Sequence, residues 1–256
     1  MPTTRAALIL CFSIGFSRLA LAFSDSIPTS GDTFVSSANP STNYGSMGAM
    51  QVAAPGLPKG EMQSLLQFNF SSAVTAFNSQ FGVGNWTVDS ITLQLGTNFG
   101  TQGQTPMNNT FNNISGGLFN IDLLANNSWS ESTATWNSLS SIETPGSDAT
   151  LTNASSPGNP FSYTAVGNTN PPTVPAATYG IGLNASLVSD ISTGGTASLR
   201  IYAADTSVSY LFNSKEFGTA ANRPVLVVDA VPEPGSIPLL AIAAFTAVAG
   251  RRRRRR

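Results

Sequence analysis

Apolar and polar residues alternate in several short stretches of the chain. The clearest stretch is residues 86–95 (WTVDSITLQL), in which Ile91, Leu93 and Leu95 are separated by polar residues. A period of two places successive side chains on opposite faces of a β-strand, so these three residues are predicted to be buried. On similar grounds, strands are expected at residues 32–36, 50–53, 65–70, 119–123, 161–166, 177–183, 197–203, 210–212 and 224–228.

Between these stretches the chain is rich in Asn, Ser, Thr and Gly, which favours short strands joined by loops over long helices. Residues 98–117 and 138–159 are expected to be loops. One short helix is expected after Asn184, whose side chain can cap it. The run at residues 224–228 (PVLVV) is apolar on both faces, so it is predicted to lie in the middle of a sheet or under a covering loop. The predicted fold class is all-β.

The N-terminus carries a different pattern. Arg5 precedes an apolar run at residues 6–16, and an A-x-A site ends at Ala22. This order is typical of a secretory signal peptide. Residues 1–22 are therefore predicted to be removed by signal peptidase, which leaves Phe23 at the start of the mature protein. The alternative is an N-terminal anchor that is never cleaved.

An apolar run near the C-terminus is followed by six arginines. Residues 235–250 carry no charge and would reach about 24 Å as a helix, slightly less than a typical hydrocarbon core of about 30 Å. Guanidinium groups are costly to move through lipid, so they are predicted to stop translocation and to leave the body of the protein outside. These topology-stop residues are Arg251, Arg252, Arg253, Arg254, Arg255 and Arg256.

The two prolines around Glu233 predict an extended, exposed segment before this run. The order of a Pro-Glu-Pro motif, an apolar run and terminal arginines over residues 231–256 resembles the PEP-CTERM sorting signal of Gram-negative, biofilm-forming bacteria. The resemblance implies that an exosortase recognises Pro232, Glu233 and Pro234 after transient anchoring in the inner membrane. It also implies a final place at the cell surface or in the extracellular matrix. The alternative is a permanent tail anchor.

Without these two signals the chain is strongly acidic. Residues 23–234 contain 4 basic residues against 13 acidic ones, a formal charge of −9. A surface without a basic patch is a poor match for phosphates, so nucleic acid is not an expected partner. The sequence has no histidine, and its single cysteine, Cys11, lies in the predicted signal peptide. Catalysis by Ser-His-Asp or Cys-His groups and disulfide bonds in the body are therefore excluded.

The predicted body, residues 23–230, contains segments that resemble the DNRLRE domain, the disaggregatase-related family. They are DTFVSSANPSTNYGS, SLLQFNF, WTVDSITLQL, WSESTATWN, GTASLRIYA and FNSKEFGTAANRPVLVV, in that order over residues 31–229. The parts most specific to this family are the NYG motif, the W-x-E-x(4)-W stretch and the C-terminal segment SKE…RP-x-L-x-V. The resemblance implies a jelly-roll-like antiparallel β-sandwich related to carbohydrate-binding modules. Gln94 departs from the family, whose strand usually has an arginine there.

Proteins commonly recognise sugars through exposed aromatic faces supported by polar side chains. The candidates for this role are Tyr44, Trp86, Arg200 and Tyr202. Arg200 and Tyr202 are expected to point outward from their strand, and Trp86 lies next to a glycine-bearing loop. Trp129 and Trp136 are instead expected to pack in the core or at a sheet edge.

Carboxylate and amide oxygens could also hold a Ca²⁺ ion, although no cofactor is otherwise expected and no EF-hand-type loop is present. The alternative is that these carboxylates are solvated or cap turns. Glu131, and Glu216 together with Arg223, are expected to make structural ion pairs or turn hydrogen bonds. The candidate cation ligands are Asp32, Asp89, Asp122, Asp148, Asp190 and Asp205.

Two functions remain open at this point. The first is a non-enzymatic surface or matrix protein whose sandwich binds an exopolysaccharide. The second is a polysaccharide-cleaving enzyme, either a histidine-free lyase or a glycosidase with a pair of carboxylates. Two facing carboxylates about 5–9.5 Å apart in an aromatic-lined cleft would favour the enzyme.

Overall fold

The computed structural model describes residues 21–96, 117–155 and 177–233, and these residues form a mostly β fold, as predicted. The helices among them are α1 (Ser71–Phe81), α2 (Trp136–Ile142), α3 (Ala185–Thr193) and the short 3₁₀ helix η1 (Ala220–Asn222). The strands are β1 (Phe23–Ser36), β2 (Ala49–Ala53), β3 (Met62–Asn69), β4 (Trp86–Leu95), β5 (Leu118–Leu124), β6 (Ala149–Ser155), β7 (Ala177–Ile181), β8 (Thr196–Ala203), β9 (Ser209–Asn213) and β10 (Val225–Pro232).

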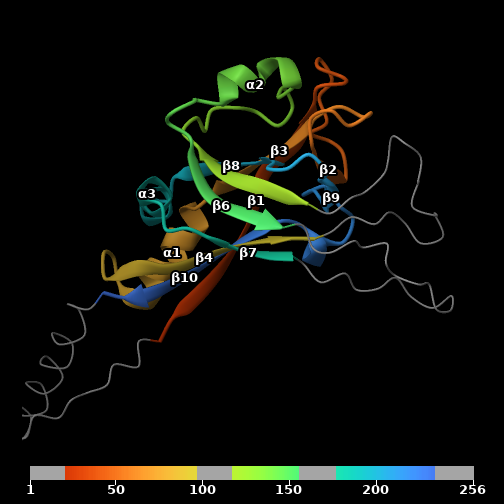
Figure 1. Ribbon diagram of the computed structural model, residues 1–256. Coiled ribbons are helices and arrows are strands. Elements are labelled where there is room, and N and C mark those ends of the chain that lie inside the picture. Colours follow the sequence, from red (N-terminus) through yellow and green to blue (C-terminus); the bar gives the residue numbers. More distant parts are fainter. Residues whose placement is uncertain (1–20, 97–116, 156–176, 234–256) are drawn as a thin grey trace, which may run out of the picture.

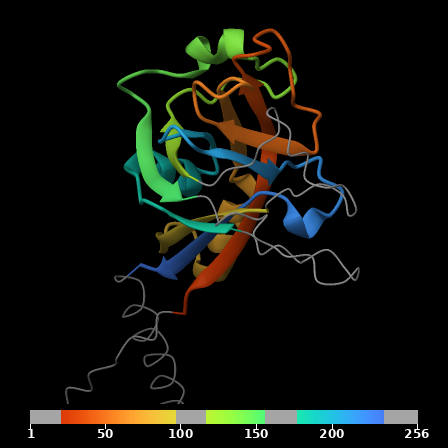
Figure 2. The same cartoon turned by 45° about the vertical axis from the view of Figure 1, so that its right-hand side comes forward.

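The strands form two antiparallel sheets that share the long strand β1. In the first sheet, residues 23–28 of β1 pair with β10, and the order is β1-β10-β4-β7. In the second sheet, residues 29–36 of β1 pair with β3, and the order is β6-β5-β8-β3-β1. The register shifts between Thr29 and Gly31, where β1 passes from one sheet to the other. Both views show β1 in red, running the length of the molecule (Figures 1 and 2).

Strands β2 and β9 pair with each other and join the second sheet where Ala53 lies opposite Met62. The antiparallel sandwich expected from the sequence is therefore confirmed. Residues 225–228 of the apolar run at 224–228 lie in β10, which has β1 on one side and β4 on the other, as the apolar pattern predicted.

The main core lies between the two sheets. Ile91, Leu93 and Leu95 of β4 are at most 2% exposed, as their alternation predicted. Leu199 and Ile201 of β8 are fully buried from the other sheet. Burying such a side chain contributes about 1.5–3 kcal/mol, so the inward rows of the two sheets supply most of the stabilisation of the sandwich.

Two helices close one end of the sandwich. α3 begins as predicted, with the Asn184 side chain accepting hydrogen bonds from the backbone of Ser186 and Leu187. It ends at Gly194, whose φ of 72° lies in the left-handed region that favours glycine. α1 was not predicted. Its buried Phe77 joins the main core, and this tertiary contact stabilises a helix whose Ser- and Thr-rich sequence has little helical preference of its own.

A second, smaller core covers the outer face of the second sheet. Its buried residues are Val35, Leu65, Leu124, Ala134, Leu139 and Ile142. The expected loop at residues 138–159 is therefore wrong, because it contains most of α2 and all of β6. α2 is short and its sequence is rich in residues that favour turns, yet one side of the helix is buried through Leu139 and Ile142. β6 pairs with β5 alone, so its polar residues could not signal a buried face.

The C-terminal end of β10 reaches into the predicted sorting signal. Pro232 is half-buried and lies opposite Trp86 of β4, so the expectation that this residue lies in an exposed tail is wrong. Glu233 is exposed, as predicted, and its backbone N–H donates to the carbonyl of Asn85. No helix in the described part of the chain is both long enough and apolar enough to cross a membrane.

Several predicted segments lie outside the described residues. These are residues 1–20 of the signal peptide, nearly all of the Asn-rich segment 98–117, the strand at 161–166, and the chain from Pro234 onward with its apolar run and arginines.

Candidate functional site

Arg200 and Tyr202 lie side by side on the outer face of β8. Both are partly exposed, while the flanking Leu199 and Ile201 are fully buried, so the predicted outward direction is confirmed. The Arg200 guanidinium carbon lies 4.1 Å from the centre of the Tyr202 ring. This is a cation–π contact, and it covers one face of the ring. A sugar could therefore stack only on the opposite face of Tyr202.

Polar side chains of the neighbouring strand extend this surface. Asn120 and Asp122 of β5 lie opposite Tyr202 and Arg200 in the ladder, so all four side chains share the outer face. We call these four residues the β5–β8 strip. Burial raises the pKa of Tyr202, although a hydrogen bond with Asn120 opposes the shift. The strip thus combines a partly exposed aromatic ring with the amide of Asn120, while the Asp122 carboxylate is buried, at 6% exposure.

Arg200 has two further partners that fix its position. Its Nη2 atom lies 2.8 Å from Oε1 of Glu143, which follows α2, and its Nε donates to Oε1 of Gln63 at 2.7 Å. The guanidinium therefore carries no free charge toward a ligand. Arg200 supports the Tyr202 ring and ties α2 to the sheet.

Trp86 does not offer the exposed face that was predicted. Its side chain is only 8% exposed, its ring centre lies 4.8 Å from that of Phe77, and its Nε1 donates to Oδ1 of Asn78 at 2.9 Å. The adjacent glycine-bearing loop does not expose it, because α1 packs over the start of β4. Trp86 is a core residue at the end closed by α1 and cannot stack on a sugar.

The NYG motif joins the loop after β1 to the loop before α2. The Asn43 side chain donates to the carbonyl oxygens of Glu131 at 2.7 Å and of Ala134 at 2.8 Å. Tyr44 is half-buried and stacks on Phe34, with ring centres 4.2 Å apart. A Cβ atom on Gly45 would lie 2.4 Å from the Glu131 carbonyl oxygen, so glycine is required for this close approach. Each residue of the motif therefore has a structural role here.

Trp129 and Trp136 lie where the sequence placed them, at the edge of a core. Both are half-buried and pack against the smaller core, and Trp129 Nε1 donates to the Ser198 hydroxyl at 2.9 Å.

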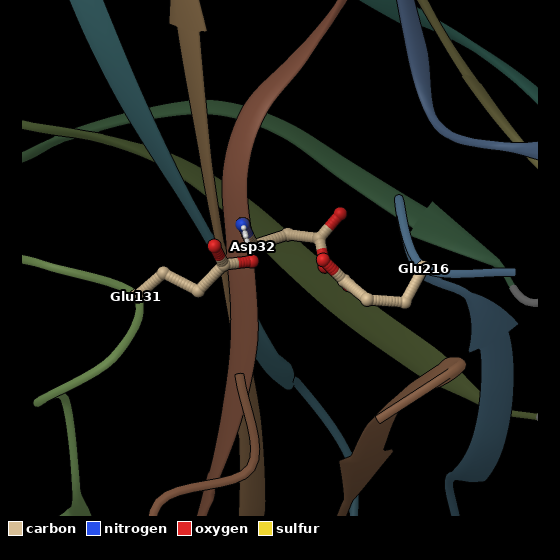
Figure 3. A group of neighbouring side chains, drawn as sticks. All are labelled: Asp32, Glu131 and Glu216. Carbon is tan, nitrogen blue, oxygen red and sulfur yellow. Dashed lines mark hydrogen bonds between the residues drawn. The ribbon is translucent and has the colours of Figure 1, made fainter. Parts of the chain in front are cut away.

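Three carboxylates meet at the edge of the second sheet. Asp32 lies on β1, Glu131 on the loop before α2, and Glu216 on the loop after β9, and one oxygen from each lies within 4.8 Å of the others. Figure 3 shows the Asp32 carboxylate pointing away from β1 toward the Glu216 side chain, with Glu131 approaching from the other side. We call these three residues the carboxylate cluster.

Lys215 is the counter-charge of the cluster. Its ammonium group lies 2.9 Å from Oε2 of Glu131 and 2.5 Å from Oε1 of Glu216. The hydrogen bond to Glu216, followed by that to Glu131, raises the pKa of Lys215 to about 12. The expected pairing of Glu216 with Arg223 is wrong, since Arg223 Nε instead donates to the Phe217 carbonyl at 2.7 Å. The expected structural role of Glu131 is confirmed by its ion pair with Lys215.

Asp32 is the most deeply buried member, at 1% exposure. Its Oδ2 accepts from the backbone N–H of Lys215 at 2.8 Å and from the Thr29 hydroxyl at 3.2 Å, and its own N–H donates to Glu131. Burial raises the pKa of Asp32 to about 7, and the charges of Glu216 and Glu131 add to the shift. Its Oδ1 atom has no hydrogen-bond partner, and neither has the buried Oε2 atom of Glu216.

Among the described residues, Asp32 is the only one of the six candidate cation ligands that lies in such a group. Burial raises the pKa of Asp205, but the hydrogen bonds that it accepts, among them those from the backbone N–H groups of Leu118, Ser207 and Val208, together outweigh burial and lower this pKa. Asp148 likewise accepts from backbone N–H groups. These two follow the alternative interpretation, in which the carboxylates stabilise turns.

Sequence reasoning missed Glu131 and Glu216 as neighbours of Asp32. A signal was available, because the NYG, W-x-E-x(4)-W and SKE segments are the most specific parts of the resemblance, and all three converge here. The cluster does not have the geometry of a glycosidase. The burial of Asp32 leaves it no access to a glycosidic bond, and Glu131 and Glu216 are both engaged by Lys215.

Comparison with known proteins adds one finding. The family model of carbohydrate-binding module family 96 matches residues 24–159, just over half of the 256-residue chain. The matched segment runs from β1 to the end of β6, so it contains Asn120 and Asp122 of the β5–β8 strip as well as Asp32 and Glu131. Among curated proteins, none matches the chain.

Proposed function

Because the chain belongs to carbohydrate-binding module family 96, we propose that it binds an exopolysaccharide and does not cleave it. The family match over residues 24–159 is the observation that carries this proposal. The β5–β8 strip is the surface that suits it best, since the partly exposed Tyr202 ring can cover the apolar face of a pyranose ring while the Asn120 amide binds its hydroxyls.

The charge of the protein favours a neutral or weakly charged glycan. The body carries a formal charge of −9, and the one cation of the strip, Arg200, is already paired with Glu143. A polyanionic chain would meet like charge over most of this surface. The proposed ligand is therefore a neutral polysaccharide that lies across β5 and β8 and stacks on Tyr202.

The proposed route to the surface follows the two terminal signals. Signal peptidase would remove residues 1–22, and an exosortase would act at Pro232, Glu233 and Pro234 to release the body into the extracellular matrix. The bounds of the β fold support this route. β1 begins at Phe23, directly after the predicted signal peptide, and β10 ends at Pro232, within the Pro-Glu-Pro motif. Because Pro232 is paired in β10, cleavage is expected on its C-terminal side.

Mass spectrometry of surface-exposed protein tests this route. The mature form is expected to begin at Phe23 and to lack residues 251–256. Recovery of the intact C-terminus from the cell surface would show that the tail is a permanent anchor instead.

Glycan binding is tested by co-sedimentation of the purified protein with a panel of neutral and acidic polysaccharides. Tyr202→Ala is expected to weaken binding to the retained glycan about tenfold, equivalent to ~1.4 kcal/mol. Val83→Ala is the matched control, because Val83 is 82% exposed and lies in the loop between α1 and β4, away from the strip. The control is expected to bind like the wild-type protein.

Two results would contradict the proposal. Equal glycan binding by Tyr202→Ala and wild-type protein would rule out the β5–β8 strip as the binding site. A protein that is retained on none of the glycans would rule out the proposed function. Reducing or unsaturated ends that are released by wild-type protein, and lost on replacement of one carboxylate, would establish the polysaccharide-cleaving enzyme.

A further inference from the structure

We infer that the carboxylate cluster of Asp32, Glu131 and Glu216 binds one Ca²⁺ ion. This inference goes beyond glycan binding and does not depend on it, because the cluster and the β5–β8 strip share no residue.

The spacing of the three carboxylates suits a single ion. Ca²⁺ takes 6–8 oxygen ligands at about 2.3–2.6 Å, so two ligands of one ion can be up to about 5 Å apart. The candidate oxygens of Asp32, Glu131 and Glu216 all lie within 4.8 Å of one another. They come from three segments that are far apart in the sequence, so the fold assembles them.

Two buried oxygens of the cluster have no other partner. Asp32 is 1% exposed, and neither its Oδ1 nor the buried Oε2 of Glu216 accepts a hydrogen bond. A buried acceptor without a partner costs about 1–3 kcal/mol, and more when it is charged. The Asp32 carboxylate points toward the Glu216 side chain, so one ion placed between the two carboxylates would bind both groups (Figure 3).

The charge of the cluster matches a divalent cation. Lys215 neutralises only one of the three carboxylates through its contacts with Glu131 and Glu216, which leaves two negative charges. Lys215 binds Oε1 of Glu216, so Oε2 of the same carboxylate stays available for a metal. The ammonium group and the ion can therefore occupy opposite sides of Glu216.

The donor atoms distinguish between metals. All of them are oxygens and the sequence has no histidine, so a hard cation is favoured over zinc or copper. Mg²⁺ requires near-ideal octahedral geometry at about 2.0–2.1 Å, whereas Ca²⁺ accepts irregular geometry. The carboxylates are already constrained by Lys215 and by the Asp32 backbone, and this irregular arrangement suits Ca²⁺.

The ion would join strand β1 to two loops at one edge of the second sheet. The loop after β1 already contacts the loop before α2 through Asn43, and Ser214 beside the cluster donates to the Met47 carbonyl at 2.5 Å. Ca²⁺ would add a bond between β1 and both other segments at their point of closest approach. Bound only in the folded state, it would raise the unfolding temperature.

Isothermal titration calorimetry of the purified full chain, first stripped with EDTA, tests the inference. CaCl₂ is expected to bind with one ion per chain and to raise the unfolding temperature by several degrees. Glu216→Gln keeps the size of the side chain but removes its charge, and it is expected to lower the Ca²⁺ affinity at least tenfold. Asp229→Asn is the matched control, since this carboxylate lies in β10 outside the cluster, and its Ca²⁺ affinity is expected to be unchanged.

A wild-type protein that takes up no Ca²⁺ at concentrations of up to about 10 mM would overturn the inference, since even weak extracellular sites saturate there. So would an unchanged affinity in both Glu216→Gln and Asp32→Asn. Because either variant could fail to fold, a crystal of wild-type protein grown with CaCl₂ gives an independent answer. Anomalous density between the three carboxylates supports the site, and its absence there overturns it.

Discussion

The two halves of strand β1 border two carboxylates in different surroundings, the partly exposed Asp229 and the buried Asp32. Residues 23–28 border β10, where the Asp229 carboxylate accepts hydrogen bonds from the hydroxyls of Ser24 and Ser90. Residues 29–36 border the carboxylate cluster, where the Oδ1 atom of Asp32 accepts none. Hydrogen bonds from Ser24 and Ser90 lower the pKa of Asp229, while burial raises the pKa of Asp32 to about 7.

Both oxygens of Asp229 therefore accept hydrogen bonds, whereas one of the two oxygens of Asp32 has no partner. Asp229 accepts hydrogen bonds from two neutral hydroxyl groups, and nearby Trp86 is buried with its Nε1 donating to Asn78. Near Asp32, the cluster holds three carboxylates, and the ammonium group of Lys215 pairs with only two of them, Glu131 and Glu216. Burial of a charge without sufficient partners is unfavourable, so the second region is expected to depend on a bound cation and the first is not.

The largest expected effect tests whether packing holds the first region. Trp86→Ala should lower the free energy of unfolding by about 3–5 kcal/mol, because it removes a buried aromatic and leaves a cavity beside Phe77. Chemical denaturation measures this change. Trp136→Ala, at a half-buried position of the smaller core, is the comparison and should cost less. A Trp86→Ala protein that is as stable as the wild type but binds glycan more weakly would show that Trp86 is a binding residue at the surface and not a core residue.

The next effect tests the second region through pH. The pKa of Asp32 is about 7 in the folded protein and 3.8 in the unfolded chain, so the folded state binds the extra proton between these values. In EDTA, stability should therefore fall as pH rises from 3.8 toward about 7. Asp32→Asn should flatten this slope, with a gain on the order of 2 kcal/mol at neutral pH, allowing for partial solvation of the ionised group.

Thermal unfolding in EDTA at several pH values measures that slope. Asp229→Asn is the control and should keep the slope of the wild-type protein over the same range. Identical pH profiles for wild type and Asp32→Asn would show that Asp32 ionises as freely as an exposed carboxylate, and the contrast between the two regions would be lost.

The smallest effect has the opposite sign. Asp229→Asn should lower the free energy of unfolding by about 1 kcal/mol at neutral pH, because it weakens two hydrogen bonds to a charged but partly exposed group. The pKa of Asp229 is lowered, so its contribution is present above pH 3.8 and is lost as pH falls through the folded-state pKa. Urea denaturation at neutral and acidic pH measures both. Asp25→Asn, on the same strand pair, should change stability much less, and an equal loss in both variants would contradict this account.

The sequence alone determined the strands that have one buried face. Alternation identified β4 and β8 almost to the residue, because a period of two forces apolar side chains onto one face wherever that face is buried. It also determined that Arg200 and Tyr202 point outward, and the Asn184 cap that begins α3. Elements without such a pattern were missed. α1, α2 and β6 are short and rich in Ser, Thr and Asn, and their apolar residues become decisive only once a sheet lies beneath them.

Only the tertiary structure decided which polar residues act together. The specific NYG, W-x-E-x(4)-W and SKE segments marked the regions that meet, but only the folding of three separate segments places Glu131, Glu216 and Lys215 around Asp32. Burial of Trp86 was equally hidden, since the helix that covers it was not predicted. Local sequence sets which face a side chain occupies on its own strand, whereas contacts between distant segments set its solvation, its pKa and its partners. In this protein, those contacts supply hydrogen bonds to both oxygens of Asp229 but leave one oxygen of Asp32 without a partner, and we expect a cation to bind there.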